Sequence, residues 1–153
     1  EGDPETGTAI ALVEQAGLIQ QRLERLADYR GHLSTEAARQ IVELHGDVTT
    51  AVSHRSGKFL TSFISKYHHF ISPGVPIFDT RAQSAIRKLD DPRRVREVWT
   101  ELPAGVRVYR NFVAAFVVLY ERAYAETTLN PSIKELDHLL WRTGHSPLVV
   151  TTS

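Results

Sequence analysis

Apolar side chains recur every three or four residues along most of the chain, a spacing typical of helices with one buried face. The first such helix ends at Gly31. Ser34 is a suitable N-cap for a second helix that extends to about His45. Gly46 and Asp47 predict a break before a short element at 48–52. The apolar stripe of the first helix consists of Leu12, Ala16, Ile19, Leu23 and Leu26.

The middle of the chain predicts a central helix from Lys58 to about Phe70, on which one arc is apolar and the opposite side is polar. The arc holds Phe59, Leu60, Phe63, Ile64, Tyr67 and Phe70, and the polar side holds Lys58, Ser62, Ser65 and His69. The run 72–74, Ser-Pro-Gly, ends this helix, and 75–78 is an extended connector. Asp79 then begins a helix to about Leu89. Its inward residues are Ala82, Ala85, Ile86 and Leu89.

The last third continues in the same way. Pro92 and Pro103 bracket a short helix, and the residues from Tyr109 to Ala123 form the clearest helical pattern in the chain. Asn130-Pro131 predicts the start of the last helix. That helix carries Ile133, Leu136, Leu139, Leu140 and Trp141, and the two tryptophans, Trp99 and Trp141, are expected to fill the core or an interface. Strand-like residues occur only at 148–150.

These patterns predict an all-α fold, a compact bundle of seven or eight helices in a single domain over residues 1–153, with 1–7 as a disordered tail. Lys plus Arg (18) equals Asp plus Glu (18), so no global charge attracts nucleic acid or membranes. Cysteine is absent, which excludes disulfides and Cys-ligated metals within the chain. The longest apolar run is too short for a membrane helix, and the first residues lack a signal-peptide pattern. We therefore expect a cytoplasmic protein.

Two neighbouring stretches carry the strongest indication of chemistry: 56–67, which contains Gly57-Lys58, and 75–82, which contains Asp79-Thr80. Together they resemble the core of the helix-hairpin-helix DNA glycosylases, the superfamily of endonuclease III and 8-oxoguanine glycosylase. In that family a Gly-Lys-like pair opens a buried helix, and a short extended stretch delivers an Asp to the start of the next helix.

The resemblance implies a glycosylase-like fold and an enzyme that acts on DNA bases in repair, as a DNA glycosylase or AP lyase. Lys58 matches the lysine nucleophile, which attacks the sugar C1′ of a flipped-out nucleotide. Asp79 matches the catalytic aspartate, which assists base loss and stabilises positive charge. Lys66 is a second candidate for the lysine. The implied DNA contacts are Arg55, Arg81, Arg87 and Lys88.

The stretch 65–79 is also similar to a pattern in uncharacterised bacterial proteins: Ser-Lys-Tyr, a His or aromatic pair, Phe, Pro, then Pro-Ile-aromatic-Asp. No function follows from that likeness.

Each candidate residue also has a structural interpretation. Asp79 before a helix is a suitable N-cap. Lys58 on a polar face is typically solvated, and Lys66 can lay its stem on neighbouring aromatic rings. Six of the sixteen residues from Arg81 to Arg96 are cationic, which suits either a phosphate-contacting edge or a solvated surface. The adjacent His68 and His69 point about 100° apart and cannot readily share one ion, so we expect no metal site and no cofactor.

Two function classes follow. The first is a DNA-glycosylase-like domain that binds or processes nucleic-acid bases, with DNA as its partner. The second is a non-enzymatic helical module that binds a protein partner, for example in a bacterial defence or toxin–antitoxin assembly. A cleft lined by a lysine and Asp79 would favour the first. An exposed apolar patch around Trp141 or Tyr124 would favour the second.

Overall fold

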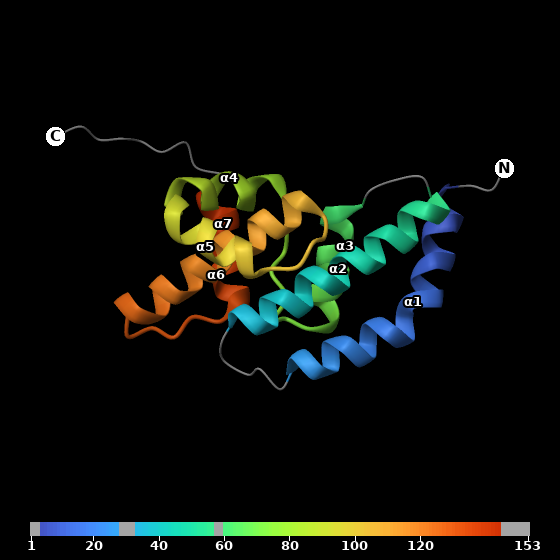
Figure 1. The fold of residues 1–153 in the computed structure, drawn as a ribbon, viewed down its shortest axis with the longest axis horizontal. Coiled ribbons are helices and arrows are strands. Elements are labelled where there is room, and N and C mark those ends of the chain that lie inside the picture. The colour runs from blue at the N-terminus through green and yellow to red at the C-terminus, as the bar shows by residue number, and fades with distance from the viewer. Residues whose placement is uncertain (1–3, 28–32, 57–59, 145–153) are drawn as a thin grey trace.

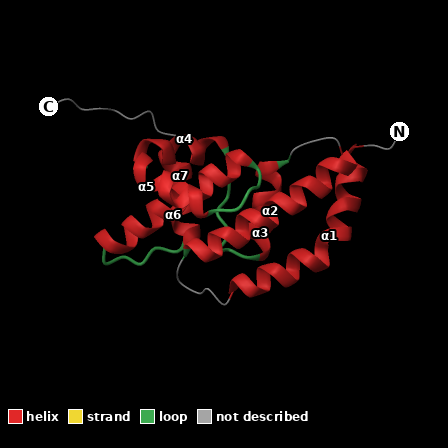
Figure 2. Cartoon of the chain, in the orientation of Figure 1, coloured by secondary structure: helices red, strands yellow, loops and turns green. Residues whose placement is uncertain are grey.

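The structure is a computed structural model that describes residues 4–27, 33–56 and 60–144. The described residues form seven α-helices joined by loops, without a strand, which confirms the all-α prediction (Figure 2). None of the described helices combines the length and the apolarity that a membrane crossing requires. The helices are α1 (Pro4–Ala27), α2 (Thr35–Ser56), α3 (Thr61–Ile71), α4 (Thr80–Leu89), α5 (Pro92–Glu101), α6 (Arg107–Glu126) and α7 (Ile133–Thr143).

Two groups of helices make up the fold (Figure 1). The long helices α1 and α2 pack side by side as an antiparallel hairpin, and α3 contacts both of them. The second group contains α4, α5 and α7, which pack against α6 or against one another. Because α2 also packs against α6, the two groups share one core.

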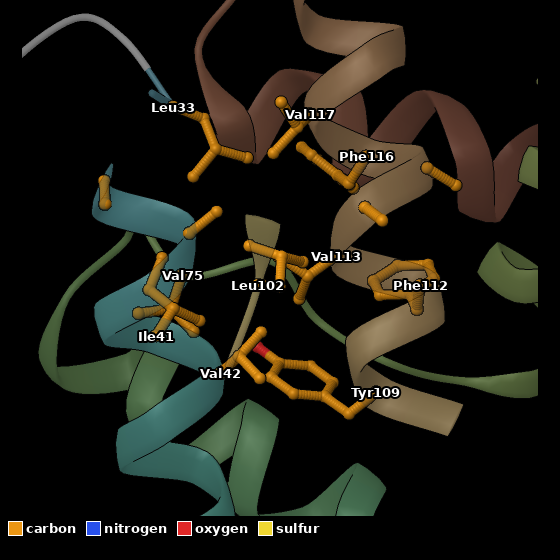
Figure 3. Close-up of a cluster of buried hydrophobic side chains, with 14 of the residues drawn as sticks. Leu33, Ile41, Val42, Val75, Leu102, Tyr109, Phe112, Val113, Phe116 and Val117 are labelled. Carbon is orange, nitrogen blue, oxygen red and sulfur yellow. The ribbon is translucent and has the colours of Figure 1, made fainter. Parts of the chain in front are cut away.

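The centre of that core is α6, whose residues from Phe112 to Val118 are all buried. Figure 3 shows side chains of α2 on one side of the core and those of α6 on the other, with Val75 of the α3–α4 connector beside them. Phe112 packs edge-on against Phe78 (5.5 Å between ring centroids) and lies 5.9 Å from Phe116. Each fully buried phenylalanine contributes roughly 1.5–3 kcal/mol of hydrophobic stabilisation.

The predicted break at Gly46-Asp47 is wrong, because α2 runs through it without interruption. The glycine instead allows the backbone at Gly105 to pack close to α2, because a Cβ at position 46 would lie 3.3 Å from the Cα of Gly105. Asp47 is held by an ion pair with Arg22 of α1, 2.7 Å apart. The glycine and the acid therefore fix neighbouring segments against α2 rather than ending it.

The predicted inward face of α3 is confirmed only in part: Ile64 is buried and Tyr67 packs against the core. Phe63 and Phe70 were expected to be buried, yet they are 47 % and 88 % exposed. The buried residues of α3 are Ile64, Ser65 and His68. The inward side is displaced because the connector after α3 folds back over Ser65 and hydrogen-bonds to it.

Three helix boundaries differ from their predictions. The last helix begins at Ile133 rather than at Asn130-Pro131, because Ser132 forms a capping box with Glu135. α1 begins at Pro4, so residues 4–7 belong to a helix rather than to a tail. α3 is described from Thr61, and Lys58, the predicted start of this helix, lies outside the described residues.

Other predicted boundaries are confirmed. α3 ends before the Ser-Pro-Gly run, Asp79 precedes α4, and α5 begins at Pro92. Three side chains predicted to face inward on α4 and α7 are partly exposed: Leu89 (39 %), Leu139 (51 %) and Trp141 (47 %). Trp99, in contrast, packs against the core and lies under the guanidinium of Arg110, 3.8 Å from its ring centroid.

Candidate functional site

The connector between α3 and α4, residues 72–79, is held by side chains from three helices. From α3, the hydroxyl of Ser65 accepts a hydrogen bond from the backbone N–H of Phe78 (3.0 Å). From α6, the buried hydroxyl of Tyr109 donates to the carbonyl of Pro76 (3.0 Å). These contacts satisfy backbone groups that a buried loop would otherwise leave unpaired, and they fix the path of the chain towards Asp79.

α7 supplies the third contact through Asp137, which is only 8 % exposed. Both of its carboxyl oxygens lie 3.3 Å from the backbone N–H of Ile77. One of them also lies 3.8 Å from Nδ1 of His69, and this nitrogen donates to the carbonyl of Val75 at 2.7 Å. Asp137 of α7 and His69 of α3 therefore both hold the connector.

Burial raises the pKa of Asp137 to about 8; the N–H of Ile77 opposes the shift and the nearby charge of Asp79 adds to it. At neutral pH this carboxyl is therefore mostly protonated. The connector is thus flanked by two acidic groups, Asp137 and Asp79, with different surroundings.

Asp79, where the connector ends, is the N-cap of α4. Its backbone is extended (φ −145°, ψ 167°), and its Oδ1 accepts hydrogen bonds from the N–H groups of Arg81 (2.9 Å) and Ala82 (2.7 Å). The two hydrogen bonds fix the orientation of this carboxyl group at the N-terminus of the helix, an end that favours negative charge. The predicted N-cap position of Asp79 is confirmed.

Lys66 is exposed and directly follows Ser65 on α3. Because Ser65 is hydrogen-bonded to Phe78, the residue before Asp79, chain geometry limits the separation of the Lys66 and Asp79 Cα atoms to about 15 Å. The long stem of lysine and the side chain of Asp79 can span much of that distance. The other lysine candidate, Lys58, lies outside the described residues.

The sequence-predicted DNA contacts are separated along α4. Arg81 lies two residues after Asp79, and its guanidinium is 5.4 Å from the ring centroid of Trp141 on α7. Arg87 and Lys88 are exposed in the last turn of α4, about 12 Å along the helix axis from Asp79. The side chain of Arg55 lies outside the described residues.

Sequence reasoning missed a second group of buried polar side chains beneath the connector. The ring of His45 stacks on that of Tyr109 at 3.9 Å between centroids and lies 6.2 Å from the ring of His68. Its Nε2 hydrogen-bonds to the carbonyl of Thr61 (3.1 Å), whereas Nε2 of His68 is buried with no hydrogen-bond partner among the described residues. The sequence did contain one indication of this burial: His45 follows Ile41 by four residues, so both lie on the same face of α2, and Ile41 is buried.

Burial lowers the pKa of His45 to about 4, and the hydrogen bond to Thr61 opposes this shift. Burial also lowers the pKa of His68 to about 3, with smaller contributions from the charges of His45 and Arg22. Both rings are therefore neutral at pH 7. The described residues contain no cluster of three His, Asp or Glu side chains able to hold a metal ion.

One open hollow of about 220 Å³ is found elsewhere, between α1 and α2. Its lining is separate from the connector and from Asp79, and consists of Ala11, Glu14, Gln15, Ala51 and His54.

Comparison of the chain with protein-family models, with curated proteins and with solved structures finds no match. The class defined here is therefore structural: an all-α chain in which a fixed connector leads to an acidic N-cap residue, Asp79.

Proposed function

We propose that this chain is a DNA-glycosylase-like domain that binds or processes nucleic-acid bases, in the bacterial cytoplasm and in DNA repair. One observation carries the proposal: the carboxylate of Asp79 is fixed at the N-terminus of α4, at the end of a connector tied to the residue that precedes Lys66. A lysine and an oriented carboxylate near one another are the groups that lysine-mediated base removal requires.

In this reaction the unprotonated amine of Lys66 forms a bond to C1′ of the nucleotide sugar. The C1′–N glycosidic bond breaks, and its electron pair leaves with the base. The proton released by the amine passes to the departing base, and Asp79 stabilises the positive charge that develops on the sugar. The resulting adduct opens to a Schiff base. Lys58 is the alternative nucleophile.

The test is reductive trapping. Purified protein is mixed with duplex and single-stranded DNA carrying a panel of damaged bases, and borohydride is added to reduce any Schiff base to a stable protein–DNA adduct. We expect an adduct that is lost in Lys66→Ala and that decreases strongly in Asp79→Asn. Lys134→Ala, which removes an exposed lysine on α7, is the matched control and should trap normally.

Loss of the adduct in Lys58→Ala alone would transfer the role of nucleophile to that residue. Absence of an adduct and of base release across the whole panel would overturn the proposed activity.

A second candidate is a helical module that binds a protein partner, as in a defence or toxin–antitoxin assembly. It is favoured by the large apolar side chains exposed on α7, Leu139 (51 %) and Trp141 (47 %), with Tyr124 (41 %) on α6. One partner co-purified in a fixed ratio, lost in Leu139→Ser and retained in Lys66→Ala, would support this function over the enzymatic one.

A further inference from the structure

One side of α3 carries two aromatic rings that the fold leaves exposed, those of Phe63 and Phe70, and a third, that of Tyr67, which packs partly against the core. Phe63, Tyr67 and Phe70, with Lys66 among them, follow the i, i+3, i+4, i+7 spacing that aligns side chains along a helix. We call these four residues the aromatic face. Phe70 is 88 % exposed and Phe63 47 % exposed, so these rings contribute little to the core.

The charge of α3 complements an anion. Its eleven residues, Thr61–Ile71, contain no aspartate or glutamate, and Lys66 supplies a positive charge. Lys66 lies in the middle of the aromatic face, and its ammonium group can contact a phosphate while the rings on either side offer flat apolar surfaces. Aromatic rings alternating with a cation form the typical surface for stacking the bases of a single strand.

The aromatic face is linked to the candidate site through Lys66. Lys66 follows Ser65, and the hydroxyl of Ser65 holds Phe78 immediately before Asp79. At about 100° per residue, Ser65 and the connector that it holds lie on the far side of α3 from Phe63 and Phe70, and Lys66 is the residue of the aromatic face nearest to the connector. Asp137, the other carboxyl at the connector, is mostly protonated at neutral pH and repels phosphate little.

We propose that the aromatic face binds single-stranded DNA, with bases stacked on Phe70 and Phe63 and a phosphate at Lys66. The choice of DNA rests on the proposed function, and the inference names its substrate as an unpaired strand. Bases in a duplex are already stacked and cannot offer their faces to these rings. The chain is also neutral overall, with 18 basic and 18 acidic residues, so stacking must supply much of the affinity.

The experiment measures fluorescence anisotropy of a labelled oligothymidylate as the full chain is added at several salt concentrations. Phe70→Ala should weaken binding roughly tenfold, because stacking contributes about 1–3 kcal/mol per base. Phe70→Trp should bind at least as tightly as the original protein. Since Phe70 is exposed, these variants keep the fold, which circular dichroism can verify. Leu129→Ala, at another exposed apolar side chain (75 %), should not change the affinity.

Two further variants separate stacking from other contacts. Phe70→Leu keeps an apolar side chain but removes the flat ring, so it should bind as weakly as Phe70→Ala. Lys66→Ala should reduce the slope of log affinity against log salt by about one, as expected for one lost phosphate contact. Full affinity in Phe70→Leu would instead indicate an apolar docking surface for a peptide and would overturn the proposal.

The proposal is also overturned if Phe70→Ala binds normally, if a duplex binds as tightly as the single strand, or if an RNA strand binds more tightly than DNA. The outcome for the proposed activity is independent. Single-strand binding that depends on Phe70, without base release from any substrate, would leave the aromatic face established and the glycosylase activity refuted. Base release with an unchanged KM in Phe70→Ala would refute the aromatic face alone.

Discussion

Asp79 has a structural role and a proposed chemical role, and two substitutions separate them. Asp79→Ala removes the acceptor for the N–H groups of Arg81 and Ala82 and should lower the free energy of unfolding by about 1 kcal/mol. Asp79→Asn keeps a capping oxygen and should cost only a few tenths of a kcal/mol, although it removes the charge that the proposed reaction requires. Urea denaturation measures both changes.

Asp91 provides the control for this pair. It caps α5 in the same manner, with its Oδ1 accepting from Arg93 N–H (3.1 Å) and Arg94 N–H (3.3 Å). Asp91→Ala should destabilise the chain by a similar amount and leave trapping of DNA unchanged. If Asp79→Asn destabilised the fold as much as Asp79→Ala, the negative charge, rather than the cap, would be the important feature of this residue.

Individual site residues differed in how far the sequence could predict them. Asp79 could be predicted because N-capping depends on a few adjacent residues. The role of Asp137 could not, because its partner Ile77 lies 60 residues away and only the packing of α7 brings them together. The inward position of Ser65 was missed for the same reason: a polar residue is buried here because a distant backbone N–H satisfies it.

At the scale of the helices, apolar periodicity predicted the regular elements well, and two errors in helix boundaries arose where glycine or proline was interpreted by local rules. Gly46 lies within α2, where it lets Gly105 approach, and Pro131 precedes the true cap at Ser132. Both residues are also common at helix ends, so only the tertiary contact or the capping box distinguishes the alternatives.

Gly144 illustrates the same principle at the end of α7. A Cβ built there would lie 2.6 Å from the backbone carbonyl oxygen of Arg81, so the first turn of α4 and the end of α7 meet too closely for a side chain. Gly144→Ala should therefore force the two helices apart and lower the free energy of unfolding by about 1–3 kcal/mol. Thermal or urea denaturation followed by circular dichroism measures the change.

Gly17 is the matched control, since it lies inside α1 and a Cβ there would have nothing within 4 Å. The same substitution should stabilise the chain, by up to about 1 kcal/mol, because alanine is the better helix former. The two substitutions should therefore change the free energy of unfolding in opposite directions. A stabilising Gly144→Ala would show that α4 and α7 do not pack as closely as described.

For the whole molecule, the buried ionisable groups oppose one another in their dependence on pH. His45 and His68 have pKa values of about 4 and about 3 in the folded state, below the ordinary value of 6.5. In acid they therefore bind fewer protons in the folded state than in the unfolded state. Their contribution to stability is complete above pH 6.5 and is lost as pH falls towards 4 and 3. Protonation of the core histidines should therefore drive unfolding in acid.

Asp137 acts in the other direction. Its pKa is about 8 when folded and 3.8 when free, so between these values the folded state binds more protons than the unfolded state, and the free energy of unfolding falls as pH rises. Below pH 6.5 the two histidines change the free energy of unfolding with pH more than the one carboxyl does. Above pH 6.5 only the contribution of the carboxyl remains. These groups together place the maximum of stability near pH 6.5.

The pH dependence of unfolding tests that maximum. In the original chain, the free energy of unfolding should fall by about 1 kcal/mol per pH unit between pH 6.5 and 8. Asp137→Asn keeps an oxygen to accept from the N–H of Ile77 but cannot titrate, so the slope in this range should disappear. Urea denaturation across the pH series measures the slope, with Asp90→Asn at the C-cap of α4 as control. An unchanged slope in Asp137→Asn would mean that this carboxyl is ionised within the fold.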